Sequence, residues 1–252
     1  MADIVFSFPV PVVPTGMCYN FITKQLYVCS TVSGYIYVYT LDGVLVDQWL
    51  HGCTAPNGMD IDVDDPDILW ITDQSTMVKI SISTHTKLQS WNMSYAINGV
   101  ATLPGLYMWL GLTTGIHRVL KSNPSGEFIN VPWSFGISDL AWDGIYLWVS
   151  GSSTQIQAIN LVDYSLIYSF TGTSNSITAL TTDGIHMWTG DEVNSTVVQF
   201  YIEKKDARNA AYYSNGVSVI RIRNLKFLEG TMTPSRNMKH KVGVGKYGGT
   251  AL

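Results

Sequence analysis

Charged side chains are scarce in this sequence. Only 13% of its 252 residues are Asp, Glu, Lys or Arg, about half the share that is usual in globular proteins. Hydrophobic residues make up 46%, so the chain can bury a large core and must present a surface rich in serine, threonine, asparagine and glycine. All-β repeat folds of this length are commonly single units.

Segments that would address the chain to a membrane or a secretory route are also lacking. No apolar run approaches the roughly eighteen residues that cross a bilayer. The first residues, Met1-Ala2-Asp3-Ile4, contain no basic segment followed by an apolar core, which is the mark of a signal peptide. The sequence therefore predicts synthesis in the cytoplasm and no membrane association.

Cysteine is rare, and the spacing of the three cysteines matches no known pairing. Cys18, Cys29 and Cys53 form neither a metal-ligand pair nor a disulfide framework. We expect buried thiols that pack as small apolar residues. If the first hairpin turns near Thr23-Lys24, then Cys18 and Cys29 are cross-strand neighbours.

Catalytic motifs are missing as well. The sequence has no phosphate-binding glycine loop, no nucleophile elbow and no histidine pair at zinc spacing, so it predicts no catalytic residue, no cofactor and no metal. The nearest approach to a metal site is an acidic run in which Asp60, Asp62 and Asp64 share one strand face. Such oxygen clusters suit Ca²⁺, but a solvated acidic turn is the favoured interpretation, because the glycine and later glutamate of an EF-hand are missing.

A repeat is the main feature that is present. Tyr27, Trp70, Trp109, Trp148 and Trp188 each follow an apolar residue in a similar stretch, at intervals of 39 to 43 residues. A fixed period near forty is typical of repeat architectures. Because these aromatic residues recur in register, we expect them to pack between repeats.

The fourth repeat shows the strand pattern most clearly. Residues 137–142, 145–149, 155–161 and 166–170 read as short strands, and Asp143-Gly144 favours the tight turn of a hairpin. Four short strands repeated about every forty residues are typical of a propeller blade.

The fifth repeat lacks an outer strand, and the N-terminus supplies one. Ile4-Val5-Phe6-Ser7-Phe8 reads like Leu166-Ile167-Tyr168-Ser169-Phe170, the outer strand of the fourth repeat. One terminus completing the last blade would close the ring and remove exposed sheet edges. The prediction is an all-β, five-bladed β-propeller of four-stranded antiparallel blades over residues 1–202, with the N-terminal strand closing the last blade.

The second repeat also resembles known propeller families. Its sequence Pro56-Asn57-Gly58-Met59-Asp60-Ile61-Asp62, followed by Leu69-Trp70-Ile71-Thr72-Asp73 and Met77-Val78-Lys79-Ile80, is similar to repeats of the NHL and YVTN-type propellers. The resemblance implies a propeller fold and carries no catalytic residue across.

The charge balance changes sharply after residue 202. Residues 1–202 contain five basic and sixteen acidic residues, whereas residues 203–252 contain ten basic and three acidic ones. We expect a basic, glycine-rich C-terminal arm, with an extra strand within residues 216–223, that docks on a neighbouring subunit; nucleic acid is less favoured because stacking aromatics are few. The candidate docking residues are Arg221, Arg223, Lys226, Arg236, Lys239, Lys241 and Lys246.

Loops at one propeller face form the candidate binding surface, because strands are committed to packing. Aromatic side chains among hydroxyls and amides could bind a glycan or form the rim of a protein contact. The candidate residues are Asp73, Tyr95, Trp133, Phe135, Asp191 and Glu192.

Together these features predict a non-enzymatic structural or protein-interaction propeller. Its partners would be protein subunits, in a homo-oligomer or a large assembly such as a phage virion. A carbohydrate-binding propeller is the alternative. A third hypothesis is a glycoside hydrolase that uses Asp73 and Asp191 as paired carboxylates.

Overall fold

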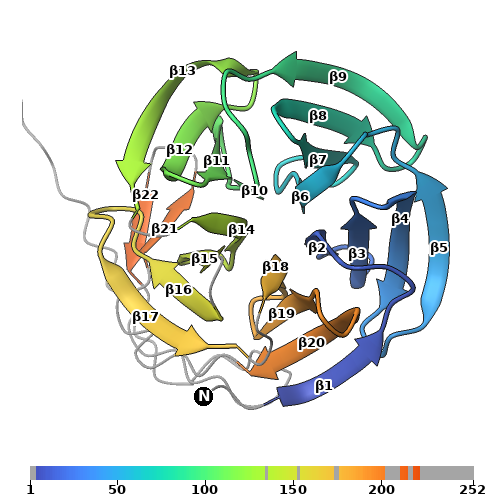
Figure 1. Ribbon diagram of the computed structural model, residues 1–252. Coiled ribbons are helices and arrows are strands. Elements are labelled where there is room, and N and C mark those ends of the chain that lie inside the picture. Colours follow the sequence, from blue (N-terminus) through green and yellow to red (C-terminus); the bar gives the residue numbers. More distant parts are fainter. Residues whose placement is uncertain are drawn as a thin grey trace, which may run out of the picture.

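Five four-stranded antiparallel sheets stand around a common axis (Figure 1). The computed structural model describes residues 4–133, 136–151, 154–172 and 176–201, and the backbone alone of residues 211–214 and 218–221. The prediction of an all-β, five-bladed propeller is confirmed. Among the described residues no helix is long and apolar enough to cross a membrane.

Blades one to four each follow the chain from the axis to the rim. Their strands are β2 (Gly16–Asn20), β3 (Gln25–Ser30), β4 (Ser33–Thr40) and β5 (Leu45–Leu50); β6 (Pro56–Ile61), β7 (Ile68–Asp73), β8 (Thr76–Ser81) and β9 (Thr86–Asn92); β10 (Gly99–Thr102), β11 (Tyr107–Leu112), β12 (Gly115–Leu120) and β13 (Asn123–Pro132); β14 (Ile137–Trp142), β15 (Leu147–Gly151), β16 (Gln155–Ile159) and β17 (Leu166–Thr171).

The fifth blade joins the two ends of the propeller. It contains β18 (Ile177–Thr182), β19 (His186–Asp191) and β20 (Thr196–Tyr201), and its outer strand is β1 (Ile4–Pro9). β1 runs antiparallel to β20, with Phe8 opposite Val197. Figure 1 shows β1 at the rim beside β20. The predicted closure by the N-terminal strand is confirmed.

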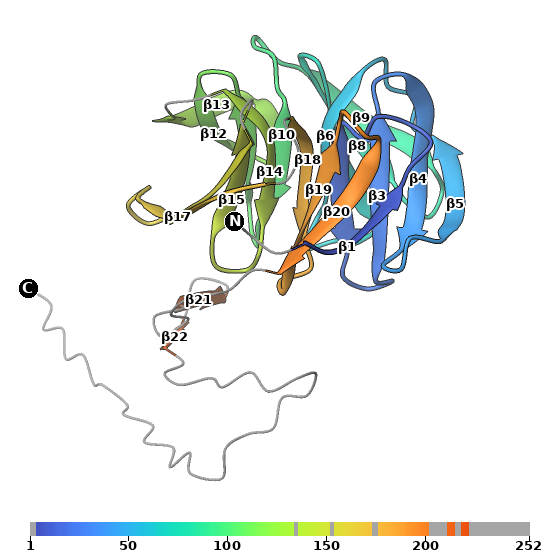
Figure 2. The same ribbon diagram turned by 60° about the horizontal axis from the view of Figure 1, so that its bottom comes forward.

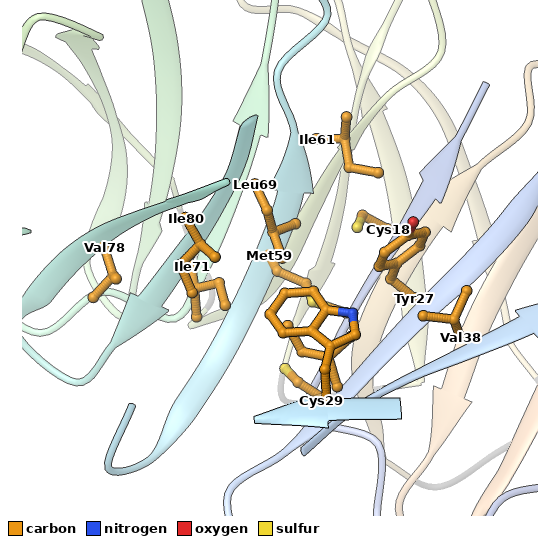
Figure 3. Close-up of a cluster of buried hydrophobic side chains, with 12 residues drawn as sticks. Cys18, Tyr27, Cys29, Val38, Met59, Ile61, Leu69, Ile71, Val78 and Ile80 are labelled. Atoms are coloured by element: carbon orange, nitrogen blue, oxygen red, sulfur yellow. The ribbon is translucent and has the colours of Figure 1, made fainter. Parts of the chain in front are cut away.

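The hydrophobic core is divided into clusters that lie between neighbouring blades. One cluster packs Tyr27 and Cys18 of blade one against Leu69 and Ile71 of blade two (Figure 3). Trp70, Trp109, Trp148 and Trp188 each occupy the corresponding cluster with the following blade, and none is more than 3% exposed. The repeated aromatic residues therefore hold adjacent blades together, as their register predicted.

The Asp143-Gly144 hairpin places the second strand of blade four slightly later than the sequence indicated. β15 starts at Leu147 rather than at residue 145, because the Asp143 carboxylate accepts hydrogen bonds from the backbone N–H groups of Ile145 and Tyr146. Gly144 takes φ of 91°, which favours glycine. The side chain of Asp143 thus closes the turn beside the backbone hydrogen bond from the Asp143 N–H to the Tyr146 carbonyl at 3.3 Å.

The cysteines are free thiols. Cys18 lies opposite Tyr27 and Cys29 lies opposite Gly16 in the β2–β3 hairpin, so the two cysteines are diagonal rather than direct neighbours. Both are fully buried, and Cys53 is half-buried. The hairpin turns through Lys24, which takes φ of 58°.

Two short strands are described beyond the propeller. β21 (Ala211–Ser214) and β22 (Ser218–Arg221) pair as an antiparallel hairpin, which lies below the propeller in Figure 2. β22 falls within the range predicted as an extra strand. The division of the chain at residue 202 stays a prediction.

Ring closure gives a first test. Phe8 is 5% exposed, packs on Tyr39 with 5.2 Å between ring centroids, and bridges blades five and one. We expect Phe8→Ala to lower the free energy of unfolding by about 3–5 kcal/mol, measured by urea denaturation. Ile4 on the same strand is 53% exposed, so the control Ile4→Ala should cost less than about 1 kcal/mol. Equal losses for the two variants would contradict the closure by packing of β1.

Candidate functional site

One polar side chain from each blade lines a cavity at the axial end of the inner strands. The cavity is wide open to solvent and has a volume of about 240 Å³. Its lining residues stand at or just before the start of β2, β6, β10, β14 and β18, the strands that surround the axis in Figure 1. We call them the axial ring: Thr15, Asn57, Asn98, Ser138 and Thr178.

Irregular strand pairing aims several of these side chains at the cavity. In blades two, four and five the register between the inner strand and its neighbour shifts at Asn57, Ser138 and Thr178. A β-bulge re-aims a side chain in this way, and bulges are frequent next to active sites. Each ring residue is half-buried while its neighbours along the strand are buried.

Glycines behind the ring let the inner strands approach one another closely. A Cβ atom on Gly58 would lie 2.6 Å from the Asn98 carbonyl oxygen, and one on Gly99 would lie 2.6 Å from the Asp139 Cα. Any larger residue would push the blades apart, so these two glycines set how tightly the ring closes.

Three ring residues each tie their own blade to the following one. The Thr15 hydroxyl donates to the Pro56 carbonyl at 2.7 Å, and the Asn98 side-chain amide donates to the Ile137 carbonyl at 2.7 Å. The Thr178 hydroxyl donates to the carbonyl of Pro14. Each acceptor directly precedes the ring residue of the following blade. These three side chains therefore have a structural role in closing the ring.

Asn57 and Ser138 differ from the other ring members. Within the part of the chain that the structure describes, neither side chain has a hydrogen-bond partner. Both line the cavity and are half-buried. A half-buried carboxamide and a half-buried hydroxyl are thus available to a molecule that enters the cavity.

A buried carboxyl group lies one residue below the ring. Asp139 is fully buried; its Oδ1 accepts from the Leu140 N–H at 2.9 Å and its Oδ2 from the Leu180 N–H at 2.8 Å. Oδ1 lies 2.9 Å from the position that a Cβ of Gly58 would take. Burial raises the pKa of Asp139 well above its usual value despite the two donors, which favours the neutral carboxyl group.

Burial also raises the pKa of other titratable groups inside the propeller. Burial raises the pKa of Asp60 to about 7, although the N–H and hydroxyl of Thr102 donate to its Oδ2. Burial likewise raises the pKa of the Cys18 and Cys29 thiols. The cavity therefore has neutral walls and a floor that favours protonated groups, and it can bind and orient a ligand through hydrogen bonds.

The two carboxylates considered for glycoside hydrolysis are both committed to backbone. Asp73 accepts from the N–H groups of Thr54 and Ala55 at 2.9 and 2.7 Å, so it fixes the loop that enters β6. Asp191 accepts from the N–H groups of Val193 and Asn194 at 2.9 and 3.2 Å, and so stabilises the β19–β20 turn. These contacts argue against a pair of catalytic acids.

The other candidate residues of the binding face lie in loops at the same end as the cavity. Tyr95 packs edge-on against His117, with 4.7 Å between ring centroids, and Trp133 packs against the cluster around Trp109. Glu192 accepts a hydrogen bond from the Ser176 hydroxyl at 2.6 Å.

Several predicted residues fall where their side chains are not described. Phe135 lies outside the described residues, and Arg221 is described only as part of the backbone of β22. The other candidate docking residues lie outside the described part as well: Arg223, Lys226, Arg236, Lys239, Lys241 and Lys246.

The acidic run joins blade two to blade three, and the interpretation as a solvated turn is wrong for its first part. Asp62 is 6% exposed; it accepts from the indole N–H of Trp70 at 2.9 Å and from the Lys121 Nζ at 2.7 Å. Lys121 also contacts Asp64 at 2.9 Å. In the described ranges no three acidic, histidine or cysteine side chains are grouped to hold a metal ion.

The axial ring was missed in the sequence, although a signal for it is present. Its members recur at intervals of 40 to 42 residues, and Asn57 and Asn98 each directly precede a glycine. A small polar residue stands at or next to the start of every inner strand, where its side chain can hydrogen-bond to the following blade. Such a pattern predicts a polar ring at the propeller axis.

Comparison with known proteins adds a structural neighbour. No protein-family model matches the sequence, and no curated protein is similar to it. The crystal structure of Myxococcus xanthus glutaminyl cyclase is similar, with a TM-score of 0.64 and 9% identity, covering 80% of this chain and 97% of that chain. At this identity the likeness shows the five-bladed propeller fold. Membership in the NHL or YVTN-type families is not shown.

The comparison corrects the functional prediction. A non-enzymatic structural component of a large assembly was expected, with a phage virion as the example; the similar structure is instead that of a propeller enzyme. No observation on the described residues supports a virion role. The expected carbohydrate-binding and hydrolase alternatives gain no support from the comparison either.

The hydrogen bonds of the buried Asp139 carboxyl group can be tested by substitution. Both of its oxygens accept from backbone N–H groups, so the amide nitrogen of Asp139→Asn would face a donor. We expect a loss of about 1–3 kcal/mol in the free energy of unfolding, measured by chemical denaturation. In the exposed control Asp163→Asn, the Oδ1 that Ser165 contacts is retained, and stability should stay within about 0.5 kcal/mol. An Asp139→Asn variant that is as stable as the wild type would contradict the assigned hydrogen bonds.

Asp60 gives a prediction for pH. Its pKa is raised from 3.8 to about 7, so between these values the folded state holds a proton that the unfolded chain releases. The contribution of Asp60 to stability is therefore present below pH 4 and is lost as pH rises through 7. The wild type should therefore lose stability between pH 4 and 7, and Asp60→Asn should not. The difference in free energy of unfolding, variant minus wild type, should rise by more than about 1 kcal/mol over this range, measured by urea denaturation at each pH. A difference that does not change with pH would show that Asp60 titrates normally.

Proposed function

We propose that this protein is a propeller enzyme that binds a small polar substrate in the cavity lined by the axial ring. The observation that carries the proposal is the convergence of five polar side chains on one cavity, of which Asn57 and Ser138 have no hydrogen-bond partner among the described residues. Both side chains are half-buried at the cavity, so water or a bound molecule can reach them. A bound molecule would supply the partners of these two.

The construction of the site supports a binding role. Its residues stand on or next to the inner strands, which are held on both sides by neighbouring blades, and sites on such rigid elements are more precise than sites on loops. Register shifts at Asn57, Ser138 and Thr178 interrupt regular pairing at three ring residues. Two of these three, Asn57 and Ser138, are the ring residues without a hydrogen-bond partner among the described residues.

The neutral walls determine how the substrate would be recognised. Because the five ring side chains are uncharged and burial raises the pKa of Asp139 below them, recognition at the ring rests on hydrogen bonds and shape. At about 240 Å³ the cavity is smaller than the 300–1,000 Å³ typical of drug-sized ligands, so it fits the end group of a substrate or a molecule of a few heavy atoms.

The similar structure indicates the first substrate to test. A glutaminyl cyclase acts, by its name, on a glutaminyl group, whose side chain ends in a carboxamide. The carboxamide of Asn57 can both donate to and accept from such a group. We therefore propose compounds with an N-terminal glutaminyl residue as the first candidates for this chain.

The experiment has a binding and a turnover readout. Binding of a glutaminyl dipeptide is measured by calorimetry, and turnover by mass spectrometry as the loss of ammonia. We expect Asn57→Ala and Ser138→Ala each to lower the association constant about tenfold, which corresponds to one hydrogen bond of about 1.4 kcal/mol. Ser122 is exposed at the opposite face, in the β12–β13 turn, so the control Ser122→Ala should bind as wild type does.

Two outcomes would overturn the proposal. The first is that neither the dipeptide nor any of a panel of small amides, alcohols and amines binds to the wild-type protein. The second is that binding occurs but is unchanged in both Asn57→Ala and Ser138→Ala, which would place the ligand outside the axial ring. Binding at the ring without ammonia release would retain the site and exclude glutaminyl cyclisation.

A further inference from the structure

The propeller face opposite the axial ring carries exposed apolar side chains at the tips of its turns. Because the strands of each blade are antiparallel, the turns after the first and third strands all lie at this face. Ile22, Leu106 and Ile185 stand in the turns that follow β2, β10 and β18, the strands around the axis in Figure 1, and are 62%, 72% and 59% exposed. Farther out, Val44 and Val162 are also exposed.

The same face concentrates the negative charge of the propeller. Its turns contain eight aspartates and two lysines, whereas the described turns at the axial-ring face contain one charged residue, Glu192, apart from His51. Exposed apolar residues that are scattered singly need no explanation, but here they share a face with a strong excess of one charge. The residues are Asp42, Asp62, Asp64, Asp65, Asp67, Asp143, Asp163 and Asp183, with Lys24 and Lys121.

The local roles of these aspartates do not cancel their charge. Asp143 accepts hydrogen bonds from the N–H groups of Ile145 and Tyr146, and Asp163 accepts from the N–H and hydroxyl of Ser165. These donors are neutral, so the turns are closed while the carboxylates stay negative. A cationic partner would therefore still be attracted to this face.

The chain itself supplies a cationic segment at this face. β20 runs from its turn with β19 at the axial-ring face to Tyr201 at the opposite face, where the propeller ends. Residues 203–252 follow directly, with ten basic and three acidic residues. Their sign is complementary to that of the face beside which they begin, and complementary charge guides association.

The β21–β22 hairpin adds a reason for contact. Its strands, Ala211-Tyr212-Tyr213-Ser214 and Ser218-Val219-Ile220-Arg221, pair with each other alone. A two-stranded hairpin is marginally stable in water unless it packs against another surface. The apolar tips around the axis offer such a surface, and the chain leaves β20 at the same face.

We propose that residues 203–252 bind back onto this acidic face of their own chain, with the basic residues beside the turn aspartates and the β21–β22 hairpin on the apolar tips. A covalent tether makes such binding intramolecular, at an effective concentration of about millimolar for a flexible linker. The occupant is therefore the chain's own C-terminal segment rather than the neighbouring subunit expected from the sequence.

The test places a nitroxide on the full chain and measures paramagnetic relaxation enhancement of the backbone amides by NMR. Ser235→Cys provides the attachment point and Cys53→Ser removes the half-buried thiol; Cys18 and Cys29 are fully buried. We expect strong enhancement at the turns around Ile22, Leu106 and Ile185 and little at the turns of the axial-ring face. Raising the sodium chloride concentration from about 0.1 to 1 M shortens the Debye length from about 10 to 3 Å and should remove at least about half of the enhancement.

Substitution of the apolar tips tests the hydrophobic part of the contact. Ile22→Ser combined with Ile185→Ser should lower the equilibrium constant for intramolecular binding about tenfold and reduce the enhancement at the opposite face. Val32 and Val193 are equally apolar and exposed turn residues at the axial-ring face. The matched control Val32→Ser with Val193→Ser should leave the enhancement unchanged.

A second pair of variants tests the charge. Asp42→Asn with Asp65→Asn removes two negative charges from exposed turns of the acidic face, and should reduce the enhancement there. Thr31→Lys with Thr114→Lys makes the same change in net charge at exposed turns of the axial-ring face. This control should have no effect, because the added charges lie away from the contact.

Three outcomes would overturn the inference. Enhancement of similar strength at both faces, or confined to the amides nearest Tyr201, is what an unattached segment produces. Enhancement that is equally sensitive to the acidic-face variants and to their controls would show that net charge, and not this surface, matters. A mixture of isotope-labelled chain without nitroxide and unlabelled chain with nitroxide detects contacts between copies; enhancement in this mixture as strong as within one chain would assign the segment to a second copy.

Discussion

The structure depends on how closely five inner strands approach one axis. Gly58 and Gly99 allow backbone contacts that a Cβ atom would prevent, and hydrogen bonds from Thr15, Asn98 and Thr178 join each of their blades to the next. The larger aromatic residues fill the widening space between the blades farther out. Close approach at the axis and bulky packing outside it together set the geometry of the ring.

That geometry also creates the cavity. Five-fold repetition brings an equivalent residue from every blade to one point, so whatever stands there is presented five times around the axis. Three of the five side chains close the ring, and Asn57 and Ser138 are left without partners among the described residues. The contacts and not the residue types set these two positions apart, since Asn98 is also an asparagine and yet donates to the Ile137 carbonyl.

The fold was predictable from the sequence, and the site was not. The spacing of Trp70, Trp109, Trp148 and Trp188 and the match of residues 4–8 to an outer strand sufficed for the propeller and its closure, because packing between repeats demands repetition. Asp73 and Asp191 suggested chemistry because they follow the aromatic strands, but local backbone donors satisfy them. Which polar residues lack partners depends on contacts between blades, such as Asn98 with Ile137, and these have no signature within one repeat.

The most direct measurement is the mapping of ligand-induced amide shifts by NMR on the full chain. With a glutaminyl dipeptide as the ligand, the largest shifts should fall on the backbone amides at the axial ring, in particular those of Asn57, Asn98 and Ser138. The amides near Ser122, at the opposite face, should not move. Shifts confined to the outer strands or to the opposite face, with the ring amides unchanged, would contradict the axial cavity as the functional site.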